Sequence, residues 1–514
     1  MLCKFRLSWP AAVLLLTSHT HAADTALSET VVTATRQPQR ADEVIADVSV
    51  IDRNTIEQSG AGSVIDLLAR QPGVQMTQNG GPGTTAQIFL RGSRTDQIKI
   101  LVDGMPINSI DISGSPLRFI PLADVERIEI LRGPASALYG ADAVGGVIQI
   151  FTRRGQKGLG GELFAGAGSY GTQKGTASFF GGDERWRFNL SGSDFRNDGL
   201  SAIRNGRNRD ADHDPASEIG LNGNVSFTPL AGHELSAQWM RNHGQTYFDS
   251  STGQGSFNSR VDFVNEVWNV ASRNRLSDAW TSTLRLGQSI DEQSSYTSAT
   301  ASTIQTRTTQ TSWQNDIDVG LGEALVLLER QEQHVGPRTR FPNNPVDVDN
   351  DALVLGWNAA LGAHRWQLAT RRDDHSSFGT HDTWSAGYGY QITNAWRING
   401  SLGTSFKAPT PYQLYATIPG SLVANPALQP EEGKNRELTL VWDKSFGTTS
   451  LTWYRNDVEN LIDYQSAPQQ YRNIGKATLK GWALAWDGRL DTWALGASLD
   501  LLDGRDASTD LRLE

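Results

Sequence analysis

The chain has 514 residues, 38% of them hydrophobic, with a formal net charge of −10 at pH 7 and a mean hydropathy of −0.40. This length is too great for one ordinary domain, and the acidic balance argues against nucleic acid as a partner. The single cysteine, Cys3, lies in a segment that we expect to be removed. The mature chain should therefore have no disulfide, no cysteine-ligated metal and no cysteine nucleophile.

Residues 1–22 are predicted to form a cleaved signal peptide. Lys4 and Arg6 give a basic start, AAVLLL (11–16) is the apolar centre, and Ala22 is a small residue at the cleavage point. The apolar run is far shorter than the roughly 20 residues of a transmembrane helix. The chain is therefore expected to be exported.

The segment from Glu29 to Arg36 (ETVVTATR) has the composition of a strand, but the polar stretch QPQR that follows it offers no evident partner. An unpaired strand at a free N-terminus favours aggregation unless another protein takes it up. We predict that this segment stays separate from the rest of the fold and that its polar linker keeps it accessible. An ordinary disordered exported terminus is the alternative.

Residues 41–155 are predicted to form a compact α+β domain. A helix should start after Ser63, its N-cap, and stop at Pro72 and Gly73. Asp103-Gly104 predicts a tight turn between two extended pieces. Further strands are expected over residues 48–52, 86–92, 125–133 and 146–154, with a helical turn over 134–140.

From about Gly160 the sequence alternates apolar and polar residues with a period of two, as in RWRFNLSGSDF (185–195) and LSAQWMRN (235–242). Short turns alternate with long loops rich in Asp, Gly and Ser, and many strands begin or end on an aromatic residue. This pattern is typical of an outer-membrane β-barrel. A soluble β-sandwich or solenoid is the alternative. Loops are expected to dominate residues 297–350.

No catalytic motif is present: the sequence has no phosphate-binding GK[ST] loop and no HExxH, GxSxG or CxxC. The glycines of GADAVGG (140–146) favour close backbone packing. Paired acids and the nine histidines are scattered. We therefore predict that the protein is not an enzyme and needs no catalytic cofactor.

Several motifs in order resemble the TonB-dependent outer-membrane receptors. They are IDLLARQPGV (65–74), AQIFLRG (86–92), ILVDGMPIN (100–108) and VERIEILRGPASALYGADAVGGVIQIFTRR (125–154), followed by GTSFKAPTPYQLY (403–415), NPALQPEEGKNRE (425–437) and YRNIGKATLKGWAL (471–484). The resemblance implies a membrane all-β barrel over residues 156–514, filled by an N-terminal α+β plug domain over 41–155, with a TonB box and linker over 23–40. It also implies residence in the outer membrane of a Gram-negative bacterium, contact with its lipid and insertion by the barrel assembly machinery.

The resemblance also sets an expected strand number. Receptors of this type have about 22 strands, whereas roughly 18 fit into this chain. The sequence ends on Glu514 in the middle of a strand pattern, without the terminal aromatic residue of the family. We therefore expect the C-terminal strands to be missing and the barrel to lack closure.

Energy coupling is implied by the N-terminal segment, which resembles the TonB box. The residues are Glu29, Thr30, Val31, Val32, Thr33 and Ala34. The expected partner is TonB with its inner-membrane energising complex. The expected mode of binding is β-augmentation, in which an extended peptide adds a strand to a sheet edge.

Within the family, the cobalamin (vitamin B12) transporters are the most similar, through QNGGPG (78–83), ISGS (112–115), RRDDHSSFGTHDTW (371–384) and YRNDVENLIDY (454–464). The resemblance implies that cobalamin or a related corrinoid binds two plug loops at Gln78, Asn79 and Gly80, and at Ser113, Gly114 and Ser115. Plain turns are the alternative interpretation of these loops. An iron siderophore or haem is the alternative cargo, and a passive porin or adhesin is the alternative class.

The family also uses calcium to order barrel loops, and the resemblance implies ligands at Asp198, Asp210, Asp212, Asp214 and Asp249. Carboxylate oxygens at alternating positions suit this hard cation. The spacing departs from that of the family, and Asn258 stands where a carboxylate is expected. A solvated acidic loop is the alternative.

Overall fold

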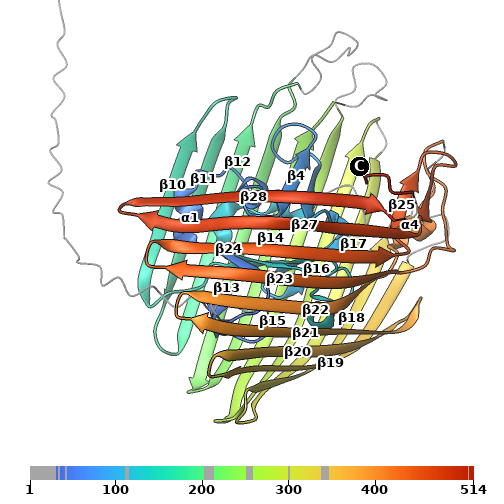
Figure 1. Ribbon diagram of the computed structural model, residues 1–514. Helices are drawn as coiled ribbons and strands as arrows, with labels where there is room; N and C mark the ends of the chain where they lie inside the picture. The colour runs from blue at the N-terminus through green and yellow to red at the C-terminus, as the bar shows by residue number, and fades with distance from the viewer. Residues whose placement is uncertain are drawn as a thin grey trace, which may run out of the picture.

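The computed structural model describes residues 31–32, 35–40, 43–109, 115–201, 213–249, 259–298, 301–336, 346–418, 420–507 and 509–513. Within these ranges the chain forms an N-terminal domain up to Thr152, which we call the plug, and a large curved antiparallel sheet, which we call the wall (Figure 1). None of the helices in the described ranges is long and apolar enough to cross a membrane.

The plug is built on a five-stranded sheet of order β3-β8-β9-β6-β7, in which only β6 and β9 run parallel. A separate hairpin, β4–β5, and several short helices pack around this sheet. The elements are β3 Val48–Ile51, α1 Arg53–Gln58, α2 Val64–Leu68, β4 Val74–Gln78, β5 Ala86–Leu90, η1 Thr95–Gln97, β6 Ile98–Val102, β7 Met105–Pro106, η2 Pro116–Phe119, η3 Leu122–Asp124, β8 Val125–Arg132, α3 Ser136–Tyr139 and β9 Gly146–Thr152.

Local chemistry explains the plug elements that the sequence predicts. The Ser63 hydroxyl accepts a hydrogen bond from the backbone N–H of Asp66 at 3.1 Å and so caps α2. Asp103 and Gly104 join β6 to β7 with φ angles of 46° and 86°, as a type I′ hairpin turn requires. Helix α1 was not predicted, because Ile56 is its only buried residue and six residues give no helical period.

The wall contains 17 strands, against the roughly 18 expected from the sequence, and its edge strands are β10 and β28. The strands are β10 Gly158–Ala167, β11 Gln173–Gly182, β12 Trp186–Asn197, β13 Ala216–Leu230, β14 His233–Tyr247, β15 Arg260–Ser277, β16 Trp280–Tyr296, β17 Ala301–Asp318, β18 Glu323–Gly336, β19 Val346–Leu361, β20 His364–His375, β21 Gly379–Thr393, β22 Trp396–Lys407, β23 Glu431–Lys444, β24 Gly447–Glu459, β27 Lys476–Leu490 and β28 Trp493–Asp506. Outside the wall lie a hairpin, β25 Ile462–Gln465 and β26 Gln470–Asn473, and the helix α4 Pro411–Tyr415.

The expectation that loops dominate residues 297–350 is wrong. Strand β17 pairs with β16 and with β18 along most of its 18 residues. Its sequence is rich in Thr and Gln, and so it lacks the alternation of apolar and polar residues that would predict a strand. Thr is nevertheless β-branched and suits a strand, and the neighbouring strands satisfy its backbone groups.

The two faces of the wall differ as a membrane barrel requires. In β16, Leu284 and Leu286 are exposed on the convex side, whereas Ser289 and Asp291 are buried on the concave side. Four strands begin with a tryptophan directly after a short turn: Trp186, Trp280, Trp396 and Trp493. The turns between wall strands at this end, which we call the turn rim, are all of two to four residues, and the long loops lie at the opposite end, the loop rim.

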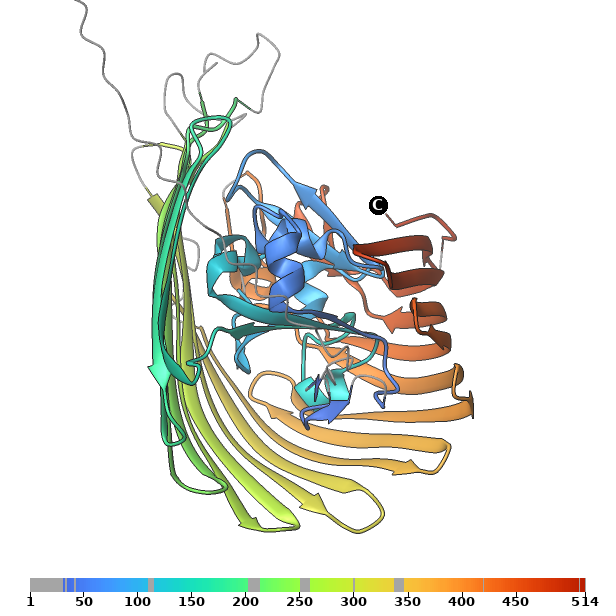
Figure 2. The same cartoon turned by 90° about the vertical axis from the view of Figure 1, so that its left-hand side faces the viewer.

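The plug lies on the concave side of the wall (Figure 2). An apolar cluster joins the two and contains both Leu138 of α3 and Leu327 of β18. The rings of Phe119 and Phe263 stack at 3.6 Å. The wall therefore holds the plug in one orientation, and this fixes which plug loops reach the loop rim.

Candidate functional site

The first predicted plug loop turns from β4 to β5 at the loop rim. The amide of Gln78 donates to the Gly81 carbonyl at 2.7 Å, and the N–H of Asn79 donates to the Thr85 carbonyl at 3.1 Å. Gln78, Asn79 and Gly80 are all exposed. Gln78 and Gly80 line a cavity of about 420 Å³ between the plug and strands β11–β15, which is large enough for much of a small ligand.

The second predicted loop is only partly placed, because Ser113 and Gly114 lie outside the described residues. Ser115 is fully buried. Its hydroxyl accepts from the N–H of Leu117 at 3.3 Å and caps η2, and its own N–H donates to the Ala86 carbonyl at 2.7 Å. The prediction that Ser115 binds the ligand is therefore corrected. This residue stabilises the end of the loop as a cap of η2 and exposes no surface to a ligand.

Residues flanking that loop do line cavities. Ser109 borders two, of about 160 Å³ and 80 Å³, and both also contain Asp96 and Asn108. The smaller one reaches Tyr139, Arg371 and the start of α4. Among the cavities that the described residues line, one therefore lies beside the first loop and two lie beside the second, at the end of the plug that faces the loop rim.

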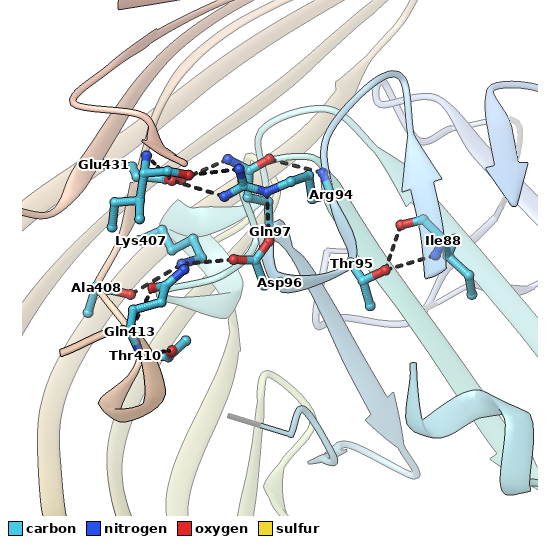
Figure 3. A network of polar contacts seen from close by, with 11 residues as sticks. Ile88, Arg94, Thr95, Asp96, Gln97, Lys407, Ala408, Thr410, Gln413 and Glu431 are labelled. Atoms are coloured by element: carbon cyan, nitrogen blue, oxygen red, sulfur yellow. Dashed lines mark hydrogen bonds and ion pairs between the residues drawn. The ribbon is translucent and has the colours of Figure 1, made fainter. Parts of the chain in front are cut away.

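A buried polar network joins the plug to the wall beneath these two cavities (Figure 3). Asp96 pairs with Arg94 at 3.2 Å and with the fully buried Lys407, at the end of β22, at 3.3 Å. Glu431, at the start of β23, lies 3.4 Å from Arg94 and accepts from the amide of Gln97 at 2.7 Å. In the sequence, Lys407 and Glu431 stand out only as members of two family motifs. Their partners in the plug lie more than 300 residues away.

The charge of Asp96 should make the plug–wall contact sensitive to acid. Burial alone would raise the pKa of Asp96, but the charges of Arg94 and Lys407 outweigh burial and hold this pKa well below its ordinary value. A carboxylate whose pKa is lower in the folded than in the unfolded chain stabilises the fold at pH values above the unfolded pKa, which is near 3.9. That stability is lost as the pH falls, by about 1.4 kcal/mol per pH unit.

We therefore expect the protection of residues 95–97 against amide exchange, taken relative to the intrinsic rate at each pH, to fall between pH 5 and pH 3 in the wild type. In the variant Asp96→Asn this protection should already be low at pH 5 and should change less on acidification. Hydrogen exchange followed by mass spectrometry measures both. An equal loss of protection in the two proteins would assign the acid effect to other groups.

The N-terminal segment is paired, contrary to the expected isolation. Val31–Val32 forms the short strand β1 and pairs with β2, Gln39–Arg40, in the same chain. Because β1 and β2 are only two residues long, they have no alternation of apolar and polar residues from which their pairing could be predicted. Glu29, Thr30, Thr33 and Ala34 lie outside the described residues.

The expectation that residues 37–40 form a free polar linker is also corrected. Gln37 is fully buried; its amide donates to Asp316 at 3.1 Å and accepts from Asn358 at 2.6 Å. Arg36 donates to the Leu138 carbonyl at 2.6 Å and pairs with Glu329 of β18 at 3.1 Å. The chain directly behind the predicted TonB box is therefore anchored to both plug and wall.

Three of the five predicted calcium ligands are described. Asp198 is exposed, Asp214 is buried, and Asp249 accepts from the Ser201 hydroxyl at 3.3 Å. Asp210 and Asp212 lie outside the described residues. Among the residues that the structure places, no three His, Cys, Asp or Glu side chains form a metal-binding group. Calcium binding stays a prediction.

This geometry defines a class of protein. The wall has an apolar outer face and tryptophans at its rim, and its concave side holds a separate plug domain. Such an arrangement is that of an outer-membrane receptor. The sequence profile "TonB-dependent Receptor Plug Domain" matches residues 40–147, and "TonB dependent receptor-like, beta-barrel" matches residues 151–513. The chain belongs to the family of TonB-dependent receptors, multi-pass barrels of the outer membrane that bind TonB. The loop rim accordingly faces the exterior and the turn rim the periplasm.

Solved structures of siderophore receptors share this fold. A variant of the ferric enterobactin receptor PfeA from Pseudomonas aeruginosa, with enterobactin bound, is 20% identical, with a TM-score of 0.77, over 89% of this chain and 81% of that one. The siderophore receptor PirA from Acinetobacter baumannii is 18% identical, with a TM-score of 0.77, over 91% and 81%. PirA from P. aeruginosa is 23% identical, with a TM-score of 0.71, over 89% and 84%. At these identities the likeness extends to the fold alone.

Proposed function

We propose that this receptor imports cobalamin across the outer membrane, with energy delivered by TonB through residues 29–34. The ligand binds at the exterior face of the plug, between the turn at Gln78–Gly80 and the cavities beside Ser109. Plug movement then opens the lumen. The cavities and the exposure of the first loop support this placement.

The observation that carries the cobalamin proposal is the charge of the cavity walls. Their described cationic residues do not exceed their carboxylates in number, so the walls carry no excess of positive charge for a multiply anionic ferric siderophore. The cations are Arg94, Lys99, Arg118, Lys174 and Arg371, and the carboxylates are Asp66, Asp96, Asp142, Asp194, Asp463 and Glu218. A corrinoid with an overall charge near zero fits these walls better.

The neutral polar side chains around the cavities support the same ligand class. Amide groups recur in the three walls, among them Gln78, Asn108, Asn197 and Gln413. Amides donate and accept hydrogen bonds at once, and cobalamin carries a fringe of amides. The wall thus offers complementary hydrogen bonding without a charged contact.

Whole-cell uptake tests the proposal. Cells that carry the receptor should accumulate labelled cyanocobalamin faster than a strain that lacks it, and excess unlabelled ligand should compete. Accumulation no faster than in the lacking strain would overturn the cobalamin proposal. If ferric siderophore uptake rose instead, the siderophore alternative would stand. If uptake proceeded equally without TonB, a passive pore would be the better description.

A further inference from the structure

The hairpin β25–β26 stands outside the wall and carries two tyrosines toward the plug. Tyr464 and Tyr471 are direct cross-strand partners, and their rings lie 5.4 Å apart in an edge-to-face arrangement. Both line the cavity of about 160 Å³, whose opposite side is formed by plug residues such as Ser109 and Pro116. Tyr464 is 40% exposed, so part of its ring is available to a ligand.

The aromatic pair is supported from behind. The Tyr412 ring of α4 meets Tyr471 edge-on at 6.5 Å and is itself buried. The Tyr464 hydroxyl donates to the Ser421 carbonyl at 2.8 Å, which fixes the outer end of that ring. Two rings held in a fixed mutual geometry present a preformed surface to a third aromatic ring.

The first residue of the hairpin is held by the polar network under the cavity. The N–H of Ile462 donates to Glu431 at 2.8 Å, and its carbonyl accepts from Arg94 at 2.7 Å. Both backbone groups of Ile462 are thus bonded to an ion pair between plug and wall, at 3.4 Å. Because Arg94 belongs to the plug (Figure 3), the position of the hairpin depends on the position of the plug.

We propose that Tyr464 and Tyr471 form an aromatic subsite for a planar aromatic group of the ligand, and that Arg94 and Glu431 are its positioning residues. The inference rests on the proposed function, under which that group is the benzimidazole base of cobalamin. A cavity of about 160 Å³ is below the ~300 Å³ of a pocket for a whole ligand. It therefore accepts one ring system while the corrin ring lies above.

The position of the ion pair gives the subsite a second property. Arg94 and Asp96 line the cavity and also bond the buried residues of the wall. A plug displacement that withdraws Arg94 removes the donor to the Ile462 carbonyl, while the bonds of the hairpin to residues 421–425 remain. The same movement that opens the lumen thus loosens the start of the hairpin and weakens the subsite.

Binding of two corrinoids to the full-length receptor in outer-membrane vesicles tests the subsite. Cyanocobalamin carries the base and dicyanocobinamide lacks it. Tyr464→Ala should weaken cyanocobalamin binding by about tenfold and leave dicyanocobinamide within twofold. Tyr464→Phe keeps the ring but loses the bond to Ser421, and should weaken cyanocobalamin binding by much less than Tyr464→Ala does. Tyr390→Ala, which removes an exposed tyrosine from the outer face of β21, is the matched control and should change neither.

The positioning role has its own readout. Arg94→Gln should reduce cyanocobalamin binding selectively, though by less than Tyr464→Ala, because the rings remain but the start of the hairpin loses one of its two bonds to the ion pair. If either variant weakened the two corrinoids equally, or weakened neither, the subsite would be overturned. A wild-type receptor that binds neither corrinoid would instead overturn the proposed function, and with it the ligand assigned here.

Discussion

Deletion of residues 29–34 should reduce energised uptake to the level of a strain without the receptor, while ligand binding at the cell surface stays within twofold of wild type. The deleted segment contains β1, which in the described part of the chain pairs with only two residues, Gln39 and Arg40. An extended peptide with so little internal pairing can exchange partners and add to a strand of TonB. Binding should persist because the ligand cavities lie at the opposite rim.

The pairing of β1 with β2 does not prevent this exchange. Only Val31 and Val32 must leave Arg40 and Gln39, and each hydrogen bond lost to strand separation contributes about 1 kcal/mol. An open cavity of about 540 Å³ lies beside β2 at the periplasmic side, bordered by Pro38. The deletion ends before Arg36, so the anchor of that residue to Glu329 remains and the plug should stay seated.

Single substitutions separate backbone pairing from side-chain recognition. Val31→Pro and Val32→Pro each remove one backbone N–H. The substitution at the position whose N–H bonds to TonB should lower uptake at least tenfold. Val31→Ala and Val32→Ala keep the backbone and should transport at rates near wild type. Uptake at the wild-type rate in the deletion variant would show that residues 29–34 are not the energy-coupling segment.

The sequence alone predicts the local elements of the plug and the repeating wall. Ser63 as a cap and Asp103-Gly104 as a turn depend on neighbours within a few residues, and the structure confirms both. The alternation of apolar and polar residues in strands such as β14 and β22 is equally local. Strand β17 was not predicted from the sequence, because its lumen-facing and outward positions are both polar over much of its length.

The candidate site was harder to predict because its contacts are long-range. Arg94 and Glu431 are 337 residues apart, and nothing near either residue identifies its partner. Ser115 is adjacent to loop residues in sequence, yet it faces inward as a helix cap. The motif thus predicts a ligand at the loop rim, but which residues of the motif face a cavity depends on packing that the sequence does not display.

Asp47→Ala should cost the plug about 3–5 kcal/mol of local stability, because it leaves two guanidinium groups buried without their shared carboxylate. Arg132 pairs with Asp47 at 3.1 Å and is almost fully buried. Arg91 pairs with Asp47 and, at 2.7 Å, with Glu437 of β23. Burial alone would raise the pKa of Asp47, but the charges of Arg132 and Arg91 hold it below its ordinary value, so this carboxylate is charged at neutral pH.

Hydrogen exchange in β3 and β8 measures the effect, since these strands flank Asp47 and Arg132. A loss of about 3–5 kcal/mol corresponds to exchange that is roughly two to four orders of magnitude faster in plug strands, while exchange in the wall should be unchanged. The matched control is Glu57→Gln, which breaks the exposed pair with Arg53 at 2.7 Å. That pair should contribute no more than about 0.5 kcal/mol. Similar exchange in both variants would mean that the buried carboxylate does not hold the plug, and that the apolar cluster containing Leu138 and Leu327 carries the docking instead.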